Sequence, residues 1–166
     1  MARSDLNVVF SGSGGAGAMS AGELLLRAAA DAGYYGVMSR LFGAQVRGGE
    51  AAALVQLSTH PTLCLPDRFD LFVALDWANA DQFATEIPLD NQSIILADPR
   101  SGAIPLSISK SGARSLPFNM AGDATPLDRA LKGKHTNVFA AGAVAALAGL
   151  PISGLHAAPT PVFGGT

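Results

Sequence analysis

One stretch near the amino terminus decides the fold: Asn7-Val-Val-Phe-Ser-Gly-Ser-Gly-Gly-Ala-Gly17. The short apolar run at its start, residues 7–11, ends in glycines and predicts a buried strand. Residues 13–17 predict a turn, because glycine adopts backbone angles that other residues avoid. The stretch therefore predicts a strand that bends sharply into whatever element follows.

The next segment, residues 18–32, predicts a helix. Its only charged residues are Glu23, Arg27 and Asp31, which are spaced by four and so fall on one stripe where they can pair. The other faces carry Ala, Leu and Met, and Gly33 is placed to end the helix. A helix with one narrow charged edge is expected to be buried elsewhere.

The rest of the chain repeats this alternation of apolar strands and helices. We expect strands at residues 34–38, 52–57, 70–76, 93–97 and 104–109. We expect helices at 78–85 and from Thr136 or Asn137 to Leu147. Asp98-Pro99 is expected to break a strand, and Lys110–Arg114 to form a solvated loop. Continuous apolar strands separated by helices are typical of a parallel sheet covered on both faces. The predicted fold class is α/β, with three α/β/α layers and a mostly parallel, Rossmann-like sheet.

The character of the chain changes after Gly149. Pro151, Pro159, Pro161 and Gly164-Gly165 disfavour regular structure. We therefore expect a domain at residues 1–150 and a Pro/Gly-rich tail or interdomain linker at 151–166.

Composition limits the classes of function. The chain has 166 residues, which fits one domain, and a net charge of −2, which argues against a dedicated nucleic-acid binder. Hydrophobic residues make up 49%, which excludes a disordered tail. Charged residues make up only 14%, where about 25% is usual. So few charges predict that much of the surface faces other protein.

The chain also lacks signals for export, membrane insertion or metal binding. A single cysteine, Cys64, cannot form an intramolecular disulfide or hold an iron–sulfur cluster alone. The amino terminus shows no targeting signal, and the longest weakly polar stretch, 137–150, is shorter than the about 20 residues that a membrane span needs. His60, His135 and His156 are too scattered to predict a metal site. We expect a soluble, cytoplasmic protein without a membrane span.

The strongest candidate for a binding site is the turn Gly12-Ser-Gly14-Gly15-Ala-Gly17. It follows a predicted strand and opens a predicted helix, where glycines let a phosphate approach the helix amides and the helix dipole favours an anion. The dinucleotide version of this motif needs an acidic residue about 20 positions on, at the end of the second strand, and this chain lacks one there, so NAD is disfavoured. The alternative is that these glycines only permit close packing of helix and sheet.

A second candidate is Phe42-Gly-Ala-Gln-Val-Arg47-Gly48-Gly49-Glu50. Two adjacent glycines form a backbone that can lie against a ligand or a partner, and the Arg47 guanidinium can hold a phosphate or a carboxylate. A structural turn, with Arg47 paired to Glu50 or another carboxylate, explains the pattern equally well. We predict no catalytic residue, because the chain has no GxSxG elbow, paired carboxylate site or Cys–His pair of suitable spacing. Asp70, Asp76 and Asp81 are expected to cap a strand and a helix.

In their order along the chain, these pieces resemble a known family. The pieces are Gly12-x-Gly-Gly-x-Gly17, Ala21-Gly22-x-Leu24-Leu25, Gly33-Tyr34, Gly43-x-x-x-Arg47-Gly48-Gly49, the Asp70 strand and Asn137-x-x-x-x-Gly142. The chain resembles the gamma subunit, or gamma-like domain, of 2-oxoacid:ferredoxin (acceptor) oxidoreductases. Residues 42–50 look most like the amino-terminal domain of the 2-oxoglutarate-type alpha subunit, although the family often has Gln where this chain has Ala16.

The resemblance implies a component of an enzyme that oxidatively decarboxylates 2-oxo acids to acyl-coenzyme A. Such complexes use thiamine diphosphate, Mg and an iron–sulfur cluster, and take coenzyme A as substrate. This chain is then expected to hold none of these cofactors itself, to be inactive alone, and to assemble with alpha- and beta-type subunits or domains that pass electrons to ferredoxin or another acceptor. Gly12, Gly14, Gly15, Gly17, Arg47, Gly48 and Gly49 would be its contribution to coenzyme A binding.

Two other hypotheses stay open on the sequence. One is a free-standing Rossmann-like module that binds a nucleotide or coenzyme, and the other is a purely structural interaction domain.

Overall fold

In the computed structural model, residues 4–43, 49–77, 80–120 and 135–150 are described. Six strands form one sheet in the order β2-β3-β1-β4-β5-β6. Their bounds are β1 (Asp5–Ser13), β2 (Tyr35–Phe42), β3 (Glu50–Ser58), β4 (Leu71–Ala74), β5 (Ile94–Ala97) and β6 (Arg114–Pro117). The pairs β1–β4, β4–β5 and β5–β6 are parallel, whereas β3 is antiparallel to both β1 and β2. The expected mostly parallel α/β sheet is confirmed, with β3 as the reversed strand.

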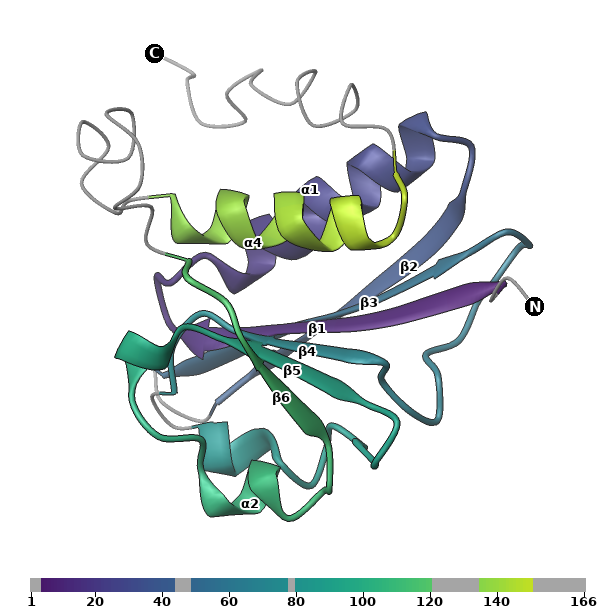
Figure 1. Cartoon of the computed structure of the whole chain (residues 1–166). Coiled ribbons are helices and arrows are strands. Elements are labelled where there is room, and N and C mark those ends of the chain that lie inside the picture. The colour runs from purple at the N-terminus through teal and green to yellow at the C-terminus, as the bar shows by residue number, and fades with distance from the viewer. Residues whose placement is uncertain (1–3, 44–48, 78–79, 121–134, 151–166) are drawn as a thin grey trace.

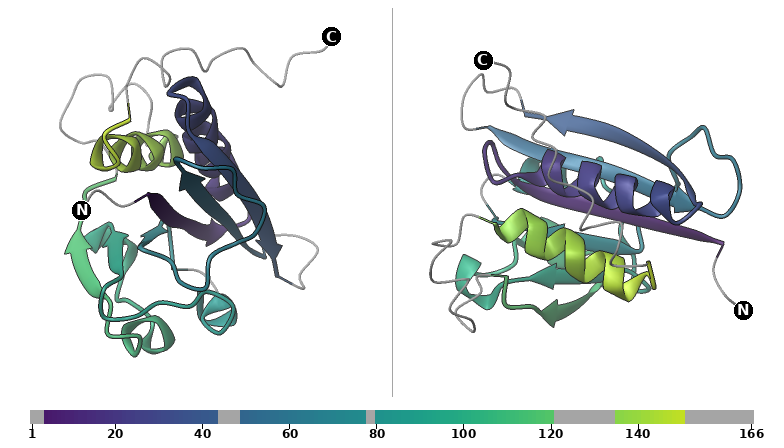
Figure 2. Two further views of the ribbon diagram at one scale, coloured as in Figure 1. Left: turned by 90° about the vertical axis from the view of Figure 1, so that its right-hand side faces the viewer. Right: turned by 90° about the horizontal axis from the view of Figure 1, so that it is seen from above.

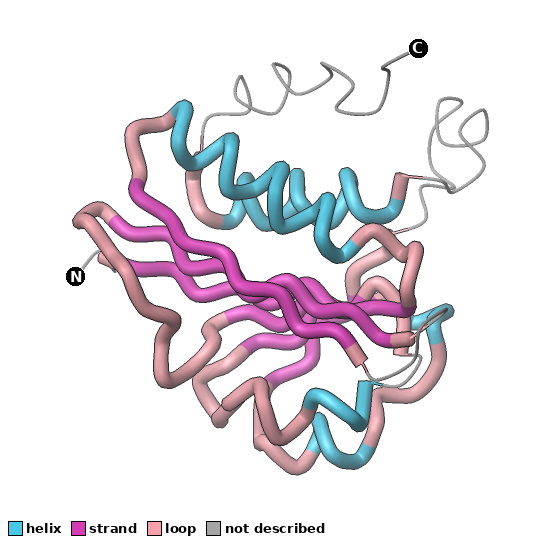
Figure 3. The backbone as a smooth tube through the Cα atoms, turned by 180° about the vertical axis from the view of Figure 1, so that it is seen from behind, coloured by secondary structure: helices cyan, strands magenta, loops and turns pink. Residues whose placement is uncertain are grey.

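Helices lie on both faces of this sheet (Figure 1). The two long helices, α1 (Ala18–Asp31) and α4 (Thr136–Leu147), lie side by side over one face. The short elements η1 (Ala80–Phe83) and α2 (Leu106–Ser109) lie on the other face, and η2 (Pro99–Ser101) follows β5 at the edge of the sheet. Figure 3 shows the same layers from behind, with the sheet between the helices.

The core is divided in two by the sheet. Under α1 and α4, the buried residues include Val8, Phe10, Leu25, Val55 and Val144. On the other face they include Val9, Phe69, Phe72, Ile95 and Ile108. Successive residues of β1 point to opposite faces, and each face is covered, so the strand is apolar at consecutive positions. This is why the deciding stretch shows no alternation of polar and apolar residues.

The prediction of a strand at residues 104–109 is wrong. Residues 106–109 form α2, which starts after Pro105. The next strand is β6, and its first residue, Arg114, falls in the stretch predicted to be a loop. The pattern misleads because only Ile108 of α2 is buried, while all four residues of the edge strand β6 are exposed. An exposed edge strand buries neither of its faces, so its sequence lacks the apolar pattern from which a strand is predicted.

Three local expectations also need correction. The helix expected at 78–85 is the shorter 3-10 turn η1 within the described residues. The N-cap position of α4 is His135 and not Thr136 or Asn137, and the His135 side chain makes no capping hydrogen bond. Glu23 of α1 pairs across to Arg40 of β2, at 2.8 Å between carboxylate and guanidinium, rather than along its own helix.

The described residues include no helix that is both long enough and apolar enough to cross a membrane.

Candidate functional site

The glycine loop, residues 12–17, joins the end of β1 to the start of α1. Gly12 is buried, whereas Gly14 and Gly15 are exposed to solvent. Gly15 and Gly17 have φ angles of +100° and +90°, which residues with a β-carbon rarely adopt. The loop therefore needs glycine at these two positions, and its outer part is open to a ligand or partner.

Asp76, just beyond the end of β4, is hydrogen-bonded to the glycine loop. Its carboxylate accepts hydrogen bonds from the Ser13 backbone N–H at 2.9 Å and from the Ser13 hydroxyl at 2.6 Å. A β-carbon on Gly12 would lie 3.5 Å from Asp76 Oδ2. Asp76 thus ties the ends of two parallel strands together, where sequence reasoning expected a cap.

The second glycine motif meets the first through Gly49. The Gly14 N–H donates to the Gly49 carbonyl at 2.6 Å, and Ser13 is paired in register with Glu50. This contact arises because β3 runs antiparallel to β1, which brings the start of β3 to the edge where β1 ends. Two motifs that the sequence presents separately are therefore adjacent in the fold. Arg47 and Gly48 lie outside the described residues.

The start of α4 packs directly against the start of α1. A β-carbon on Gly17 would lie 2.6 Å from Asn137 Nδ2, so only glycine allows this approach. Neither helix has a side-chain cap, and neither has an acidic residue in its first turn. The amino ends of two helices, each with a partial positive charge, thus meet beside the glycine loop. This arrangement is electrostatically suited to an anion.

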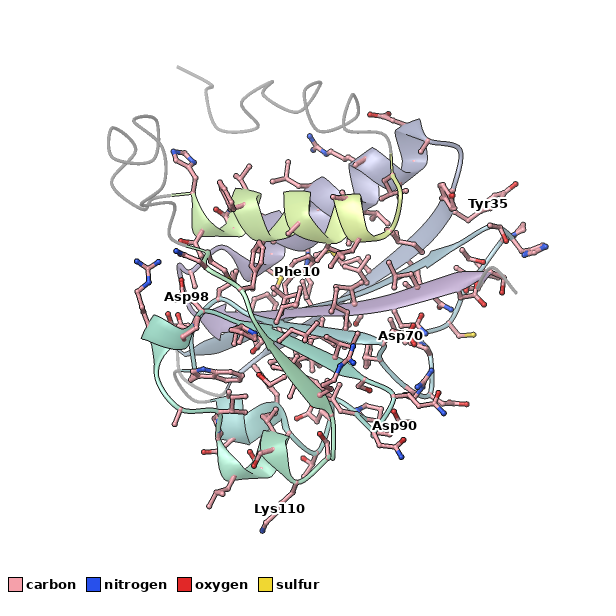
Figure 4. All side chains as sticks on the ribbon, in the orientation of Figure 1. Phe10, Tyr35, Asp70, Asp90, Asp98 and Lys110 are labelled. Carbon is pink, nitrogen blue, oxygen red and sulfur yellow. The ribbon has the colours of Figure 1, made fainter. Side chains whose placement is uncertain are left out.

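Asp98 is a buried carboxylate that sequence reasoning did not single out (Figure 4). It lies just after β5, at the same end of the parallel strands as the glycine loop. Asp98 accepts hydrogen bonds from Arg100 Nε at 3.1 Å, from Arg100 Nη2 at 3.0 Å and from the Met120 N–H at 2.9 Å. Arg100 Nη2 also donates to Asn119 Oδ1 at 2.6 Å. The only sequence signal was that Asp98-Pro99 ends a strand. Asp98 thus holds the start of the chain segment that leads toward α4.

A network of hydrogen bonds and ion pairs lies at the other end of the parallel strands, where they begin. Asp70 accepts hydrogen bonds from the Asn7 N–H and from Arg68, both at 3.0 Å, and Arg68 also pairs with Asp90. The hydrogen bond from the Gln92 backbone N–H, aided by Arg68, lowers the pKa of Asp90 below its ordinary value. These contacts join strand starts far from the glycine loop.

The other candidates from the sequence stay apart. Asp81 accepts a hydrogen bond from the Ser107 hydroxyl, which ties η1 to α2, and Lys110 is exposed at the end of α2. In the described part of the chain, no group of three or more His, Cys, Asp or Glu residues is arranged to hold a metal ion.

Comparison with known proteins places this fold and loop in a family. The model of the family described as pyruvate ferredoxin/flavodoxin oxidoreductase matches residues 7–165. No curated protein matches the chain.

Three solved structures share the fold. One is 2-oxoglutarate:ferredoxin oxidoreductase from Magnetococcus marinus with 2-oxoglutarate, coenzyme A and succinyl-CoA bound, at 25% identity and TM-score 0.74; the match covers 92% of this chain and 26% of that one. The gamma subunit of keto/oxoacid ferredoxin oxidoreductase from Geobacter sulfurreducens PCA matches at 23% identity and TM-score 0.68, over 92% of this chain and 83% of that one. Pyruvate oxidoreductase subunit PORC from Thermotoga maritima matches at 20% identity and TM-score 0.66, over 93% and 83%.

This chain thus spans about a quarter of the Magnetococcus enzyme chain but most of each smaller subunit. With a family match over nearly its whole length, the chain belongs to the pyruvate ferredoxin/flavodoxin oxidoreductase family.

Proposed function

We propose that the chain is a non-catalytic subunit or domain of a thiamine-diphosphate-dependent 2-oxoacid:ferredoxin or acceptor oxidoreductase, of the 2-oxoglutarate type. The family match and the two solved subunits, of which the match covers 83%, support the component role. The Magnetococcus protein is a 2-oxoglutarate:ferredoxin oxidoreductase and supports the choice of 2-oxoglutarate, although its chain is about four times as long as the matched part. In this proposal thiamine diphosphate, Mg and the iron–sulfur cluster belong to alpha- and beta-type partners, and this chain supports the oxidative decarboxylation that forms acyl-coenzyme A.

The proposed contribution of this chain is to bind a phosphate group of coenzyme A. The observation that carries the proposal is the meeting of two uncapped helix amino ends at a solvent-exposed glycine loop. Backbone N–H groups of α1 would donate to the phosphate, and its dipole would favour the negative charge. Gly12, Gly14, Gly15 and Gly17 would permit the close approach.

The second motif would complete the site from the side of β3. Gly49, the last glycine of that motif, already contacts Gly14 of the loop. Arg47 would supply a guanidinium to the phosphate, and Gly48 would leave room for the ligand. The Asp76 carboxylate opposes an anion, but its hydrogen bonds with Ser13 offset part of that charge.

Calorimetric titration of coenzyme A into the assembled enzyme tests this proposal. We expect Gly14→Val to block the approach, and Arg47→Ala to weaken binding by about 10- to 100-fold, because a hydrogen bond to a charged group contributes about 1.5–3 kcal/mol. Lys110→Ala removes a cation far from the loop and should leave the affinity unchanged. Unchanged affinity in both Gly14→Val and Arg47→Ala would reduce the loop to a packing element.

A further inference from the structure

The strand β2 forms one edge of the sheet and is paired along its whole length with β3. Its eight residues pair with β3 from Tyr35 opposite Ser58 to Phe42 opposite Ala51. Within the described residues, no strand pairs with its other side. The view from above in Figure 2 shows β2 as the outermost strand, on the side of the sheet that α1 covers. Half of its backbone groups are therefore available to another strand.

This edge lacks the features by which proteins usually protect an edge strand. It contains no proline and no lysine, and its one charged residue, Arg40, is bonded to Glu23. The opposite edge strand, β6, differs in each respect: it has four residues, starts with Arg114 and ends with Pro117. Short length, charge and proline all discourage pairing between edges. Of the two edge strands in the described part of the sheet, β2 is the one suited to pairing.

Large apolar side chains are exposed at both ends of β2. Tyr34 is 37% exposed, Tyr35 is 50% exposed and Phe42 is 66% exposed. Aromatic residues on an unpaired edge are costly in water and stabilise cross-strand pairs by about 0.2–1 kcal/mol each. The apolar area and the open backbone therefore lie in one place.

We propose that β2 pairs with β2 of a second copy of this chain. The two strands run antiparallel about a two-fold axis normal to the sheet, with Met38 opposite Met38 of the second copy. The two six-stranded sheets then become one continuous sheet.

The exposed residues select this register. An axis normal to the sheet keeps each face on its own side, so residues of the same face stand opposite one another. Met38 and Gly36 face α1, since they approach Gly22 and Leu26 of that helix, and by alternation Phe42 shares this face. In the proposed dimer β2 extends by one residue, which places Tyr34 on this face as well.

With Met38 at the axis, Tyr34 of each copy lies opposite Phe42 of the other, and Arg40 lies opposite Gly36. Both exposed aromatic residues on the α1 face gain a partner, and no two arginines face each other. The next register of the same kind, centred on Ser39, would place Phe42 opposite Gly36 and lose the aromatic pair. The side chains thus favour the pairing centred on Met38.

The helices above the sheet leave room for this arrangement. α1 lies over β3, because a β-carbon on Gly22 would come 2.8 Å from Ala53 Cβ and 3.2 Å from Val55 Cγ2. Three strand spacings separate the two β3 strands in the dimer, which is about 14 Å at about 4.8 Å each. Packed helices need about 8–10 Å between axes, so the two α1 helices do not collide.

Sedimentation equilibrium of the full chain over a concentration series tests the dimer. We expect a reversible monomer–dimer equilibrium whose Kd rises at least about tenfold in Phe42→Lys, because a charge replaces an aromatic pair at each end. Leu147→Lys makes the same change on α4, where Leu147 is 70% exposed, and should leave the Kd unchanged. Circular dichroism confirms that both variants fold. A chain that stays monomeric throughout, or a dimer broken by Leu147→Lys and not by Phe42→Lys, would overturn the proposal.

Cross-linking tests the register independently. In a Cys64→Ser background, Met38→Cys should form a disulfide with its copy, because paired strands place opposite Cα atoms about 4.5–5.5 Å apart, within disulfide range. The double variant Tyr34→Cys/Phe42→Cys should also cross-link, and serves if Met38→Cys does not fold. Ser115→Cys on β6 is the control and should stay monomeric under denaturing electrophoresis. Cross-linking through Ser115 alone would contradict pairing at β2.

Discussion

At the scale of single residues, the site depends on glycines that do different work. Gly15 has a positive φ but open space around it, so only its backbone conformation requires glycine. Gly17 has a positive φ and also contacts Asn137, so both backbone and space require it. The sequence shows both as parts of one motif. Only the fold separates them, because the contact with Asn137 joins residues far apart in the chain.

Gly17→Ala is therefore expected to destabilise the protein more than an ordinary loop substitution. The left-handed backbone costs about 1–2 kcal/mol, and displacing Asn137 adds about 1–3 kcal/mol. Gly33→Ala is the matched control, since Gly33 has φ +83° with no atom within 4 Å of the added carbon, and should lose only the backbone part. Urea unfolding of both variants measures the difference, and equal losses would show that α4 yields freely at its amino end.

At the scale of elements, the sequence predicted well where both faces of a strand or one face of a helix are buried. The strands β1, β3, β4 and β5 and the helices α1 and α4 were found, because burial leaves a continuous or periodic apolar pattern. β6 and α2 were missed or misassigned because they lie at an edge with little buried surface. Their structure is set by backbone pairing with β5 and by packing on η1, which local sequence does not encode.

Two helical glycines give opposite expectations at this scale. Alanine is favoured over glycine in a helix by about 1 kcal/mol. In α4, Gly142→Ala should gain that stability, since nothing lies within 4 Å of the added carbon. In α1, Gly22→Ala should instead lose about 1 kcal/mol or more, because the carbon would come 2.8 Å from Ala53 Cβ and force α1 away from β3.

Thermal unfolding of the two variants checks the signs. A Tm that rises for Gly142→Ala and falls for Gly22→Ala is the expected result. A rise in both would mean that the contact between α1 and β3 relaxes at little cost.

At the scale of the whole molecule, apolar surface is left uncovered. α4 carries no charged residue between Thr136 and Leu147, and Val138, Phe139 and Leu147 of this helix are exposed. Together with the low charge of the whole chain, this surface favours assembly into a larger enzyme.

A tagged form of the chain, expressed with the other components of its enzyme, is accordingly expected to retain partner polypeptides on an affinity column. The eluate should be brown, with the visible absorption of an iron–sulfur cluster, and should contain thiamine diphosphate. The tag on an unrelated protein provides the control. Elution as a colourless single chain that binds a nucleotide by itself would favour the free-standing module instead.

The sequence by itself determined the fold class, the glycine loop and the family resemblance, because glycines, apolar strands and their spacing are properties of neighbouring residues. The tertiary structure alone decided that β3 is reversed, that Gly49 and Asn137 reach the glycine loop, and that Asp76 and Asp98 organise the edge where the parallel strands end. These contacts depend on strand order and direction, which follow from how all the buried faces pack together and from no single stretch of the chain.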